Sequence, residues 1–157
     1  MPGEIEREAS RLVAWDRELR EAHDRLRAAL RLAQQSADAD LPDVTRELLL
    51  YCQGFCVALG AHHEGEDRLL FPELRSAFPE LTNTIAILEQ DHAMIAHLLR
   101  ALQAAVDAAA APPELAQHFA GIAAIMESHF RFEERKLLDI LESLELDAEP
   151  EAVFGPL

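Results

Sequence analysis

Glycine and strand-like patterns are scarce in this chain of 157 residues. It has six glycines, and no segment alternates apolar and polar residues in the β-branched manner of a half-buried strand. Alanine, leucine and other residues that favour helices dominate instead. We therefore predict an all-α protein, and the length is that of one domain with a sizeable hydrophobic core.

Positive charge, long apolar runs and cysteine are also in short supply. The formal net charge of −15 at pH 7 argues against nucleic acid or anionic lipid as a partner. No apolar run reaches the roughly 20 residues needed to span a bilayer, and the N-terminus lacks a signal-peptide core. Cys52 and Cys56 lie one helical turn apart, an awkward geometry for a disulfide. These absences favour a cytoplasmic protein of bacterial type, and they leave its oligomeric state open.

Prolines and polar segments divide the chain into four long helices. We predict helices over about 3–36, 40–72, 82–111 and 112–144, the second bending at Pro72. Four helices joined by short loops make an antiparallel up-down-up-down bundle the expected architecture of residues 1–144. Residues 145–157 form an acidic tail that we expect to pack loosely along the surface, with Phe154 as its one apolar anchor.

Each predicted helix carries one histidine on its apolar stripe. The four are His23, His62, His92 and His129. A lone histidine on such a stripe is more often a hydrogen-bonded core residue than a metal ligand. We counted the residues between each histidine and the loop that joins its helix to the neighbouring one. The counts place His92 and His129 within one turn of each other along the bundle, and they match less closely for His23 and His62. Four histidines in one layer, one from each helix, are hard to explain as separate accidents.

Two of these histidines begin the same short motif. His62 stands four residues before Glu66, and His129 stands four residues before Glu133. On a helix this spacing puts imidazole and carboxylate on one face, about 6 Å apart, where both can hold metal. Burying these groups in an apolar bundle would be costly without cations. Nitrogen and oxygen ligands without thiolate suit iron or manganese, and carboxylates that can bridge favour two ions over a single zinc.

In order and spacing, these residues resemble the hemerythrin-like HHE cation-binding family. The likeness covers about 18–144 and includes the Leu-Phe-Pro sequence at 70–72 that follows the first His-x-x-x-Glu motif. It implies a hemerythrin-like four-helix bundle that holds two iron ions with an oxo or hydroxo bridge. The ligands that it implies are His23 and His62 for one iron, His92 and His129 for the other, and Glu66 and Glu133 as bridges.

The chain departs from the oxygen-carrying members of that family at one histidine. Those proteins have a second histidine one turn after the third-helix ligand, where this chain has Ala96, and His97 is turned outward. The resemblance therefore implies open metal positions, as expected of a reactive centre rather than a carrier. The fourth-helix acid is also ambiguous, because the carriers use a spacing of five, here Glu134, and the wider family a spacing of four, here Glu133.

Neighbours of the motifs are candidates for additional ligands. His63, Glu64 and Asp67 flank the first motif, where a solvated helix face is the simpler explanation. Glu89 belongs to the only Glu-x-x-His motif, a form that ferritin-like bundles use twice, and it could fill an open metal position.

Tyr51 and His118 form a possible second polar layer. They lie eleven residues from His62 and His129, beyond an apolar layer at seven residues that comprises Leu30, Phe55, Leu99 and Ile122. The pair could serve a proton or electron path. Greater hydration near helix ends explains the polar residues as well.

From these observations we predict a non-haem di-iron protein that binds and converts a small oxidant. The family resemblance implies hydrogen peroxide first, then dioxygen or nitric oxide, with an electron donor that the sequence does not identify. The implied activity is a catalase-like or related redox reaction. The alternative is non-catalytic binding, sensing or storage of dioxygen or iron, and a bundle with incidental histidines ranks third.

Overall fold

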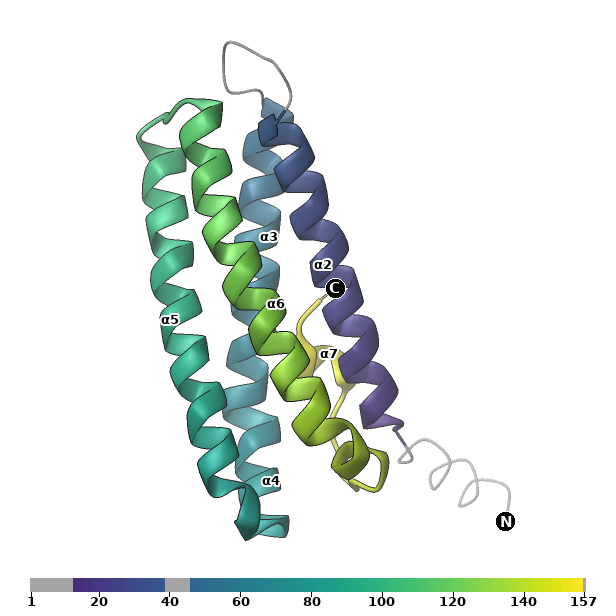
Figure 1. Ribbon diagram of the computed structural model, residues 1–157. Helices are drawn as coiled ribbons and strands as arrows, with labels where there is room; N and C mark the ends of the chain where they lie inside the picture. The colour runs from purple at the N-terminus through teal and green to yellow at the C-terminus, as the bar shows by residue number, and fades with distance from the viewer. Residues whose placement is uncertain (1–12, 39–45, 157) are drawn as a thin grey trace, which may run out of the picture.

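Four long helices lie side by side along one axis in the computed structural model (Figure 1). The structure describes residues 13–38 and 46–156. The long helices are α2 (Trp15–Asp38), α3 (Arg46–Gly65), α5 (Thr82–Asp107) and α6 (Pro112–Glu142). No strand occurs among the described residues, so the predicted all-α class is confirmed. In the same residues, no helix is long and apolar enough to cross a membrane.

Successive long helices run in alternating directions along the bundle. In Figure 1, α2 and α5 rise while α3 and α6 descend. α2 packs against α3 and α6, and α5 packs against the same two helices. The four helices therefore enclose one shared interior, as in the expected bundle.

Prolines and short turns set the helix boundaries. Pro112 begins α6, where its fixed φ suits the first turn and its missing N–H is not needed. Pro79 likewise begins the short 3₁₀ turn η2 (Pro79–Leu81), which leads directly into α5. The predicted start of the first helix near residue 3 and the predicted start of the second at Asp40 lie outside the described residues.

Near Pro72, where we expected a bend, the helix type changes from π to α. α3 continues into the π-helical segment η1 (Glu66–Leu70), after which the Phe71 N–H donates to the carbonyl of Glu66, five residues back. α4 (Phe71–Ala77) follows, with Pro72 in its first turn, where a missing N–H is tolerated. Single π-helical turns are frequent at functional sites, and this one begins at Glu66.

Two apolar clusters fill the bundle. The first includes Leu30, Phe55, Leu99 and Ile122, which are at most 8% exposed, so the predicted apolar layer is confirmed. The second includes Trp15, Leu88, Leu137 and Phe154. Each of the four predicted stripe histidines stands in the sequence between a member of one cluster and a member of the other. The histidine layer therefore separates the two apolar clusters.

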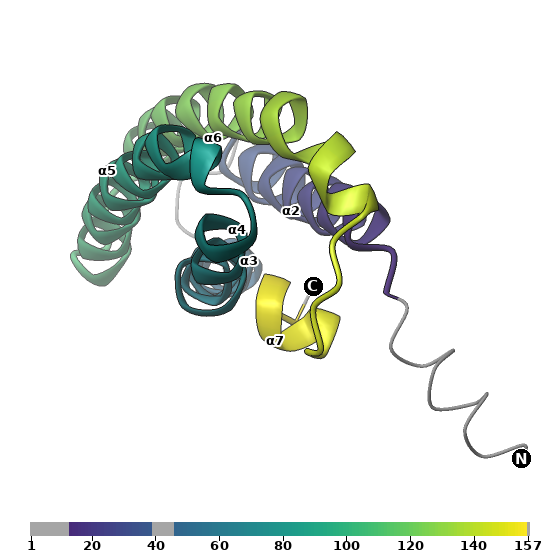
Figure 2. The same cartoon turned by 90° about the horizontal axis from the view of Figure 1, so that it is seen from below.

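The C-terminal tail folds back onto the bundle. It contains α7 (Pro150–Phe154), which lies against α2, α3 and η1 (Figure 2). Val153 is buried together with Phe154, and the Phe154 ring meets the Trp15 ring edge-on with centroids 5.9 Å apart. Phe154 is therefore an apolar anchor of the tail, as expected. The expectation of loose packing with no second anchor is wrong, because Val153 is also buried and the tail backbone lies close against Gly65.

Candidate metal centre

Seven polar side chains are buried together in the layer between the two apolar clusters. They are His23, His62, His63, Glu66, His92, His129 and Glu133, and they are at most 6% exposed. All four long helices contribute, and η1 supplies Glu66. The layer therefore brings together the six residues expected from the motifs and adds His63.

Potential ligand atoms of this layer fall into two overlapping groups. One group comprises His23, His62, Glu66 and Glu133, and the other comprises His63, Glu66, His92 and His129, with all atoms of a group within 4.8 Å of one another. Glu66 belongs to both groups. A Glu133 oxygen lies 3.3 Å from His129 Nε2 and 3.9 Å from His23 Nε2. Both carboxylates thus lie between the two sets of histidines.

Several inward-facing atoms of the layer have no partner in hydrogen-bonding geometry. These atoms are Nε2 of His23, His62 and His63 and both carboxylate oxygens of Glu66 and Glu133. A buried polar atom left unpaired costs about 1–3 kcal/mol, so seven such atoms in one layer need an explanation. Metal cations fit this donor set, because imidazole nitrogens and carboxylate oxygens are ligands for iron, manganese or zinc.

Carboxylates orient three of the histidines through hydrogen bonds to the ring nitrogen that faces away from the layer. The pairs are His23 Nδ1 with Glu134 at 2.9 Å, His92 Nδ1 with Asp67 at 2.7 Å, and His129 Nδ1 with Asp91 at 3.0 Å. A carboxylate accepts a hydrogen bond from Nδ1–H and so directs the Nε2 lone pair to the opposite side of the ring. Here that opposite side faces the centre of the layer. Histidines that ligate metal are commonly held in this way.

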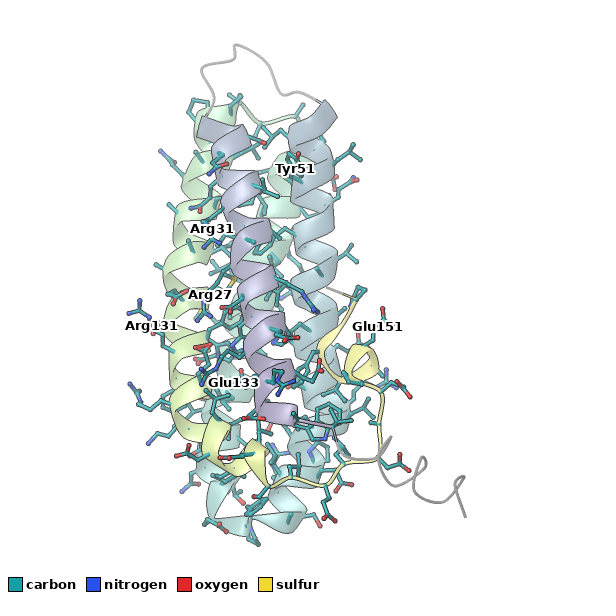
Figure 3. All side chains as sticks on the ribbon, turned by 90° about the vertical axis from the view of Figure 1, so that its right-hand side faces the viewer. Arg27, Arg31, Tyr51, Arg131, Glu133 and Glu151 are labelled. Atoms are coloured by element: carbon teal, nitrogen blue, oxygen red, sulfur yellow. The ribbon has the colours of Figure 1, made fainter. Side chains whose placement is uncertain are left out.

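The two acids after His129 have different surroundings. Glu133 is fully buried among the potential ligands, whereas Glu134 is 20% exposed and pairs with Arg27 at 3.0 Å as well as with His23. Helix geometry explains the difference, because a residue four positions on returns to the same face and the next one is turned about 100° away. On the same helix, Arg131 points away from the bundle (Figure 3). Glu133 therefore lies among the potential ligand atoms, and Glu134 accepts a hydrogen bond from His23 on the outer side of the layer.

The structure places His63 inside the layer and not on a solvated face. Its ring stacks on that of His92 with centroids 3.9 Å apart and lies 5.1 Å from that of His129. The layer therefore gains a nitrogen on the α5 side, where the absence of a histidine at Ala96 suggested a gap.

Helix geometry explains how two successive histidines both reach the layer. His62 faces His23 on α2, with ring centroids 5.1 Å apart, while His63 faces α5. Consecutive helical residues point about 100° apart, and α3 packs against both α2 and α5. Its position next to His62 made His63 a candidate additional ligand in the sequence, and the structure buries it in the layer.

Glu89, Tyr51 and His118 lie outside both groups. Glu89 forms an ion pair with Arg75 and is 37% exposed. Tyr51 and His118 are half-buried, and Tyr51 lies towards the end of the bundle far from Glu133 (Figure 3). A role for the latter two in a proton or electron path stays a prediction.

Burial controls the protonation of the two carboxyl groups in the metal-free layer. It raises the pKa of Glu66 to about 7. Burial also raises the pKa of Glu133, and the charge of Glu66 nearby raises it further. Without cations these groups hold protons at a pH where exposed carboxyls are ionised, so metal binding would displace protons.

Burial acts on the imidazoles in the opposite direction. It lowers the pKa of His62 to about 4 and those of His23 and His63 well below the usual range. Burial also disfavours the charged form of His129, but the Glu133 carboxyl group, 3.3 Å from its Nε2, outweighs burial and raises its pKa to about 9. Three of the imidazoles are therefore neutral near pH 7, the form that binds metal.

Phe130 is an aromatic residue of the site that the motifs did not indicate. Its ring stacks on that of His23, with centroids 3.8 Å apart and planes 5° from parallel. It also lies 5.9 Å from the His62 ring and 6.0 Å from the His129 ring, and the Arg27 guanidinium lies over it at 5.3 Å. Phe130 thus covers the layer on the side of the first apolar cluster. Its position directly after His129 was the available signal.

Comparison with protein families gives an independent result. The family model described as hemerythrin HHE cation binding domain matches residues 16–141. No curated protein and no solved structure matched the chain. The matched span takes in the four long helices almost completely and all seven residues of the buried layer. With this match over most of its length and a histidine and carboxylate layer in its interior, the chain belongs to the hemerythrin HHE cation-binding family.

Proposed function

We propose that the protein binds two iron ions in the buried layer and converts a small oxidant, with hydrogen peroxide first and dioxygen or nitric oxide next. The main support is the contrast between inward-facing atoms without partners and outward-facing histidine nitrogens that are held by hydrogen bonds. We also propose that this activity is located in the cytoplasm.

The two ligand groups would each hold one ion. The residues are His23 and His62 on one side, His63, His92 and His129 on the other, and Glu66 and Glu133 between them. Bound iron would supply redox electrons and a position for the oxidant. The side with two histidines has one imidazole fewer than the other, so we place binding of the oxidant there.

Residues around the layer would control water and protons. Phe130 excludes water from the imidazoles that it covers. Asp91 is 37% exposed, accepts a hydrogen bond from His129 and lines a groove between α5 and α6. It therefore connects a buried imidazole with solvent, and it could pass protons to and from the site.

His63 favours a second candidate function. A third histidine on one side leaves fewer open positions there, and a more fully ligated centre suits reversible binding better than turnover. The alternative is therefore non-catalytic binding, sensing or storage of dioxygen or iron. Both functions use the same residues, so kinetics must separate them.

Peroxide turnover at defined iron content tests the proposal. Protein loaded anaerobically with Fe²⁺ should consume hydrogen peroxide and release dioxygen over many turnovers per chain. Glu66→Ala given the same total iron is the control, because free iron also decomposes peroxide. Equal rates in both samples would reject the enzyme. Reversible binding of dioxygen without turnover would support the alternative.

A further inference from the structure

We propose that residues 145–156 form a strap that positions His62 for metal binding, so that docking of the strap and binding of metal stabilise each other. The contact between strap and site is the Phe154 backbone carbonyl, which accepts a hydrogen bond from His62 Nδ1 at 3.0 Å. The part of the proposal that concerns metal rests on the proposed function. The part that concerns His62 does not.

His62 is held differently from the three histidines that pair with carboxylates. Their acceptors belong to the bundle itself, on η1, α5 and α6. The acceptor for His62 belongs to a segment that follows the bundle in the sequence. A neutral imidazole can carry its proton on either nitrogen. The strap carbonyl favours the proton on Nδ1, which leaves Nε2 of this fully buried ring free to face the layer.

Aromatic contacts hold the strap in place beside His62. The Phe154 ring lies 5.5 Å from the His62 ring at an interplanar angle of 27°. The Trp15 ring meets the Phe154 ring edge-on, with centroids 5.9 Å apart. Phe154 is 3% exposed. Trp15 is the single tryptophan of the chain, so its fluorescence reports directly on whether Phe154 is docked.

The strap backbone packs directly against Gly65 of α3. Its φ of −62° and ψ of −42° are ordinary helical values that any residue adopts. Space is what requires glycine here, because an added Cβ would overlap the backbone of Val153 and Ala152. Gly54 and Gly60 on the same helix have nothing within 4 Å of such a Cβ. Of the three glycines on α3, only the one beneath the strap leaves no room for a methyl group.

Gly155, which follows Phe154, also lets the strap backbone lie close to α3. Its φ of 87° lies in the left-handed region that favours glycine. A Cβ at this position would also lie 3.1 Å from the backbone nitrogen of His62. Both glycines thus bring the strap backbone close to α3 at the level of His62.

Two clefts lie on either side of the strap. A cleft of about 260 Å³ lies between the strap and α2 and is lined in part by Ala22, next to His23. A second cleft of about 370 Å³ lies between the strap and α3 and is lined in part by Ala61 and Gly65. Glu151 points outward from the strap (Figure 3). Undocking would join the clefts over the side of the layer that has two histidines.

Gly65→Ala tests the proposal, with Gly60→Ala as the matched control. Both changes add one methyl group to α3, and the control meets no neighbour. In the metal-free protein, Gly65→Ala should shift Trp15 emission to longer wavelength. Long-range ¹H–¹⁵N spectra should show a His62 proton fixed on Nδ1 in wild type and shared between the nitrogens in Gly65→Ala. Release of Fe²⁺ to a chelator under anaerobic conditions should become at least about ten-fold faster.

Three results would overturn the proposal. Gly65→Ala could match Gly60→Ala in Trp15 emission, or it could shift that emission and leave the His62 tautomer unchanged, or it could change both and leave iron release unchanged. If Gly65→Ala does not fold, Phe154→Ala replaces it, with the His62 tautomer and iron release as measurements. Failure of wild type to bind iron would reject both the proposed function and the link between strap docking and metal binding. Trp15 emission and the His62 tautomer in the metal-free protein would still decide whether the strap positions His62.

Discussion

At Glu66, the cost of burying a carboxyl group is offset in two different ways. Without metal, burial raises its pKa to about 7, so the group keeps its proton near neutral pH. With cations, the ionised form would be stabilised by two neighbouring positive charges. The i to i+4 spacing was enough to predict its proximity to His62, and the Nε2 to Oε1 distance is 3.1 Å. Its protonation depends on the surrounding apolar packing, which no local motif describes.

Glu66 should make the metal-free protein less stable as pH rises. Between its ordinary value of 4.5 and about 7, the folded carboxyl holds a proton that the unfolded one has lost. Unfolding then releases a proton, so stability falls through this range and levels off above it, by an amount of the order of 3 kcal/mol. Urea unfolding of metal-free wild type and Glu66→Gln from pH 5 to 7.5 measures the difference. A difference independent of pH would contradict the account.

Substitutions of Glu133 and Glu134 should have different effects on metal binding. Glu133→Ala removes a buried potential ligand and should abolish stable metal binding, whereas Glu134→Ala removes only the acceptor behind His23 and should weaken it about 10–100-fold. Iron titration with a competing chelator measures both. Glu127→Ala is the control, because Glu127 also pairs with Arg27 but not with a histidine of the layer. Loss of metal in Glu134→Ala alone would reverse the assignment.

At the scale of the helix, α6 combines two functions at the level of the buried layer. His129 and Glu133 face the layer, and Phe130 lies between the layer and the first apolar cluster. The stacked Phe130 and His23 rings fix the distance of α6 from α2 at this level. The helix is therefore both a support for the ligands and a barrier against water.

Phe130→Ala should destabilise the protein by about 3–5 kcal/mol in the metal-free state, because it leaves a cavity beside the imidazoles of His23, His62 and His129. Phe132→Ala is the matched control on the same helix, where the ring is half-buried and contacts Arg135 and Lys136. Urea unfolding should show a much smaller loss for the control. Similar losses in the two variants would mean that Phe130 is not a structural part of the site.

Helices were predictable from the sequence where local signals decide them. Pro112 begins α6 and Thr82 begins α5 as expected, because helix starts depend on nearby residues. The π-helical turn at Glu66 and the docked strap had no such signal. The strap fits because Gly65 and Val153, far apart in the sequence, meet only after the bundle has formed. His63 was a candidate additional ligand, but the sequence could not decide between the buried layer and a solvated face, since its burial depends on the position of α3 between two other helices.

For the whole molecule, the buried layer links stability to metal. Ligand that binds only the folded state stabilises it by RT ln(1 + [L]/Kd), or about 2.7 kcal/mol at a free concentration of 100 Kd. For a domain of this size, Fe²⁺ should then raise Tm by about 5–10 °C. Anaerobic calorimetry with and without Fe²⁺ measures the shift, with Glu66→Ala as the control. An equal shift in the control would point to binding elsewhere on the acidic surface.

The number of irons per chain tests the central claim most directly. Protein saturated with Fe²⁺ under anaerobic conditions, freed of excess metal by gel filtration and analysed for metals and protein should contain about two irons per chain. Glu133→Ala treated in parallel should retain fewer than half as many. A wild-type content near one iron per chain, or retention of zinc with exclusion of iron, would contradict a dinuclear iron centre between Glu66 and Glu133.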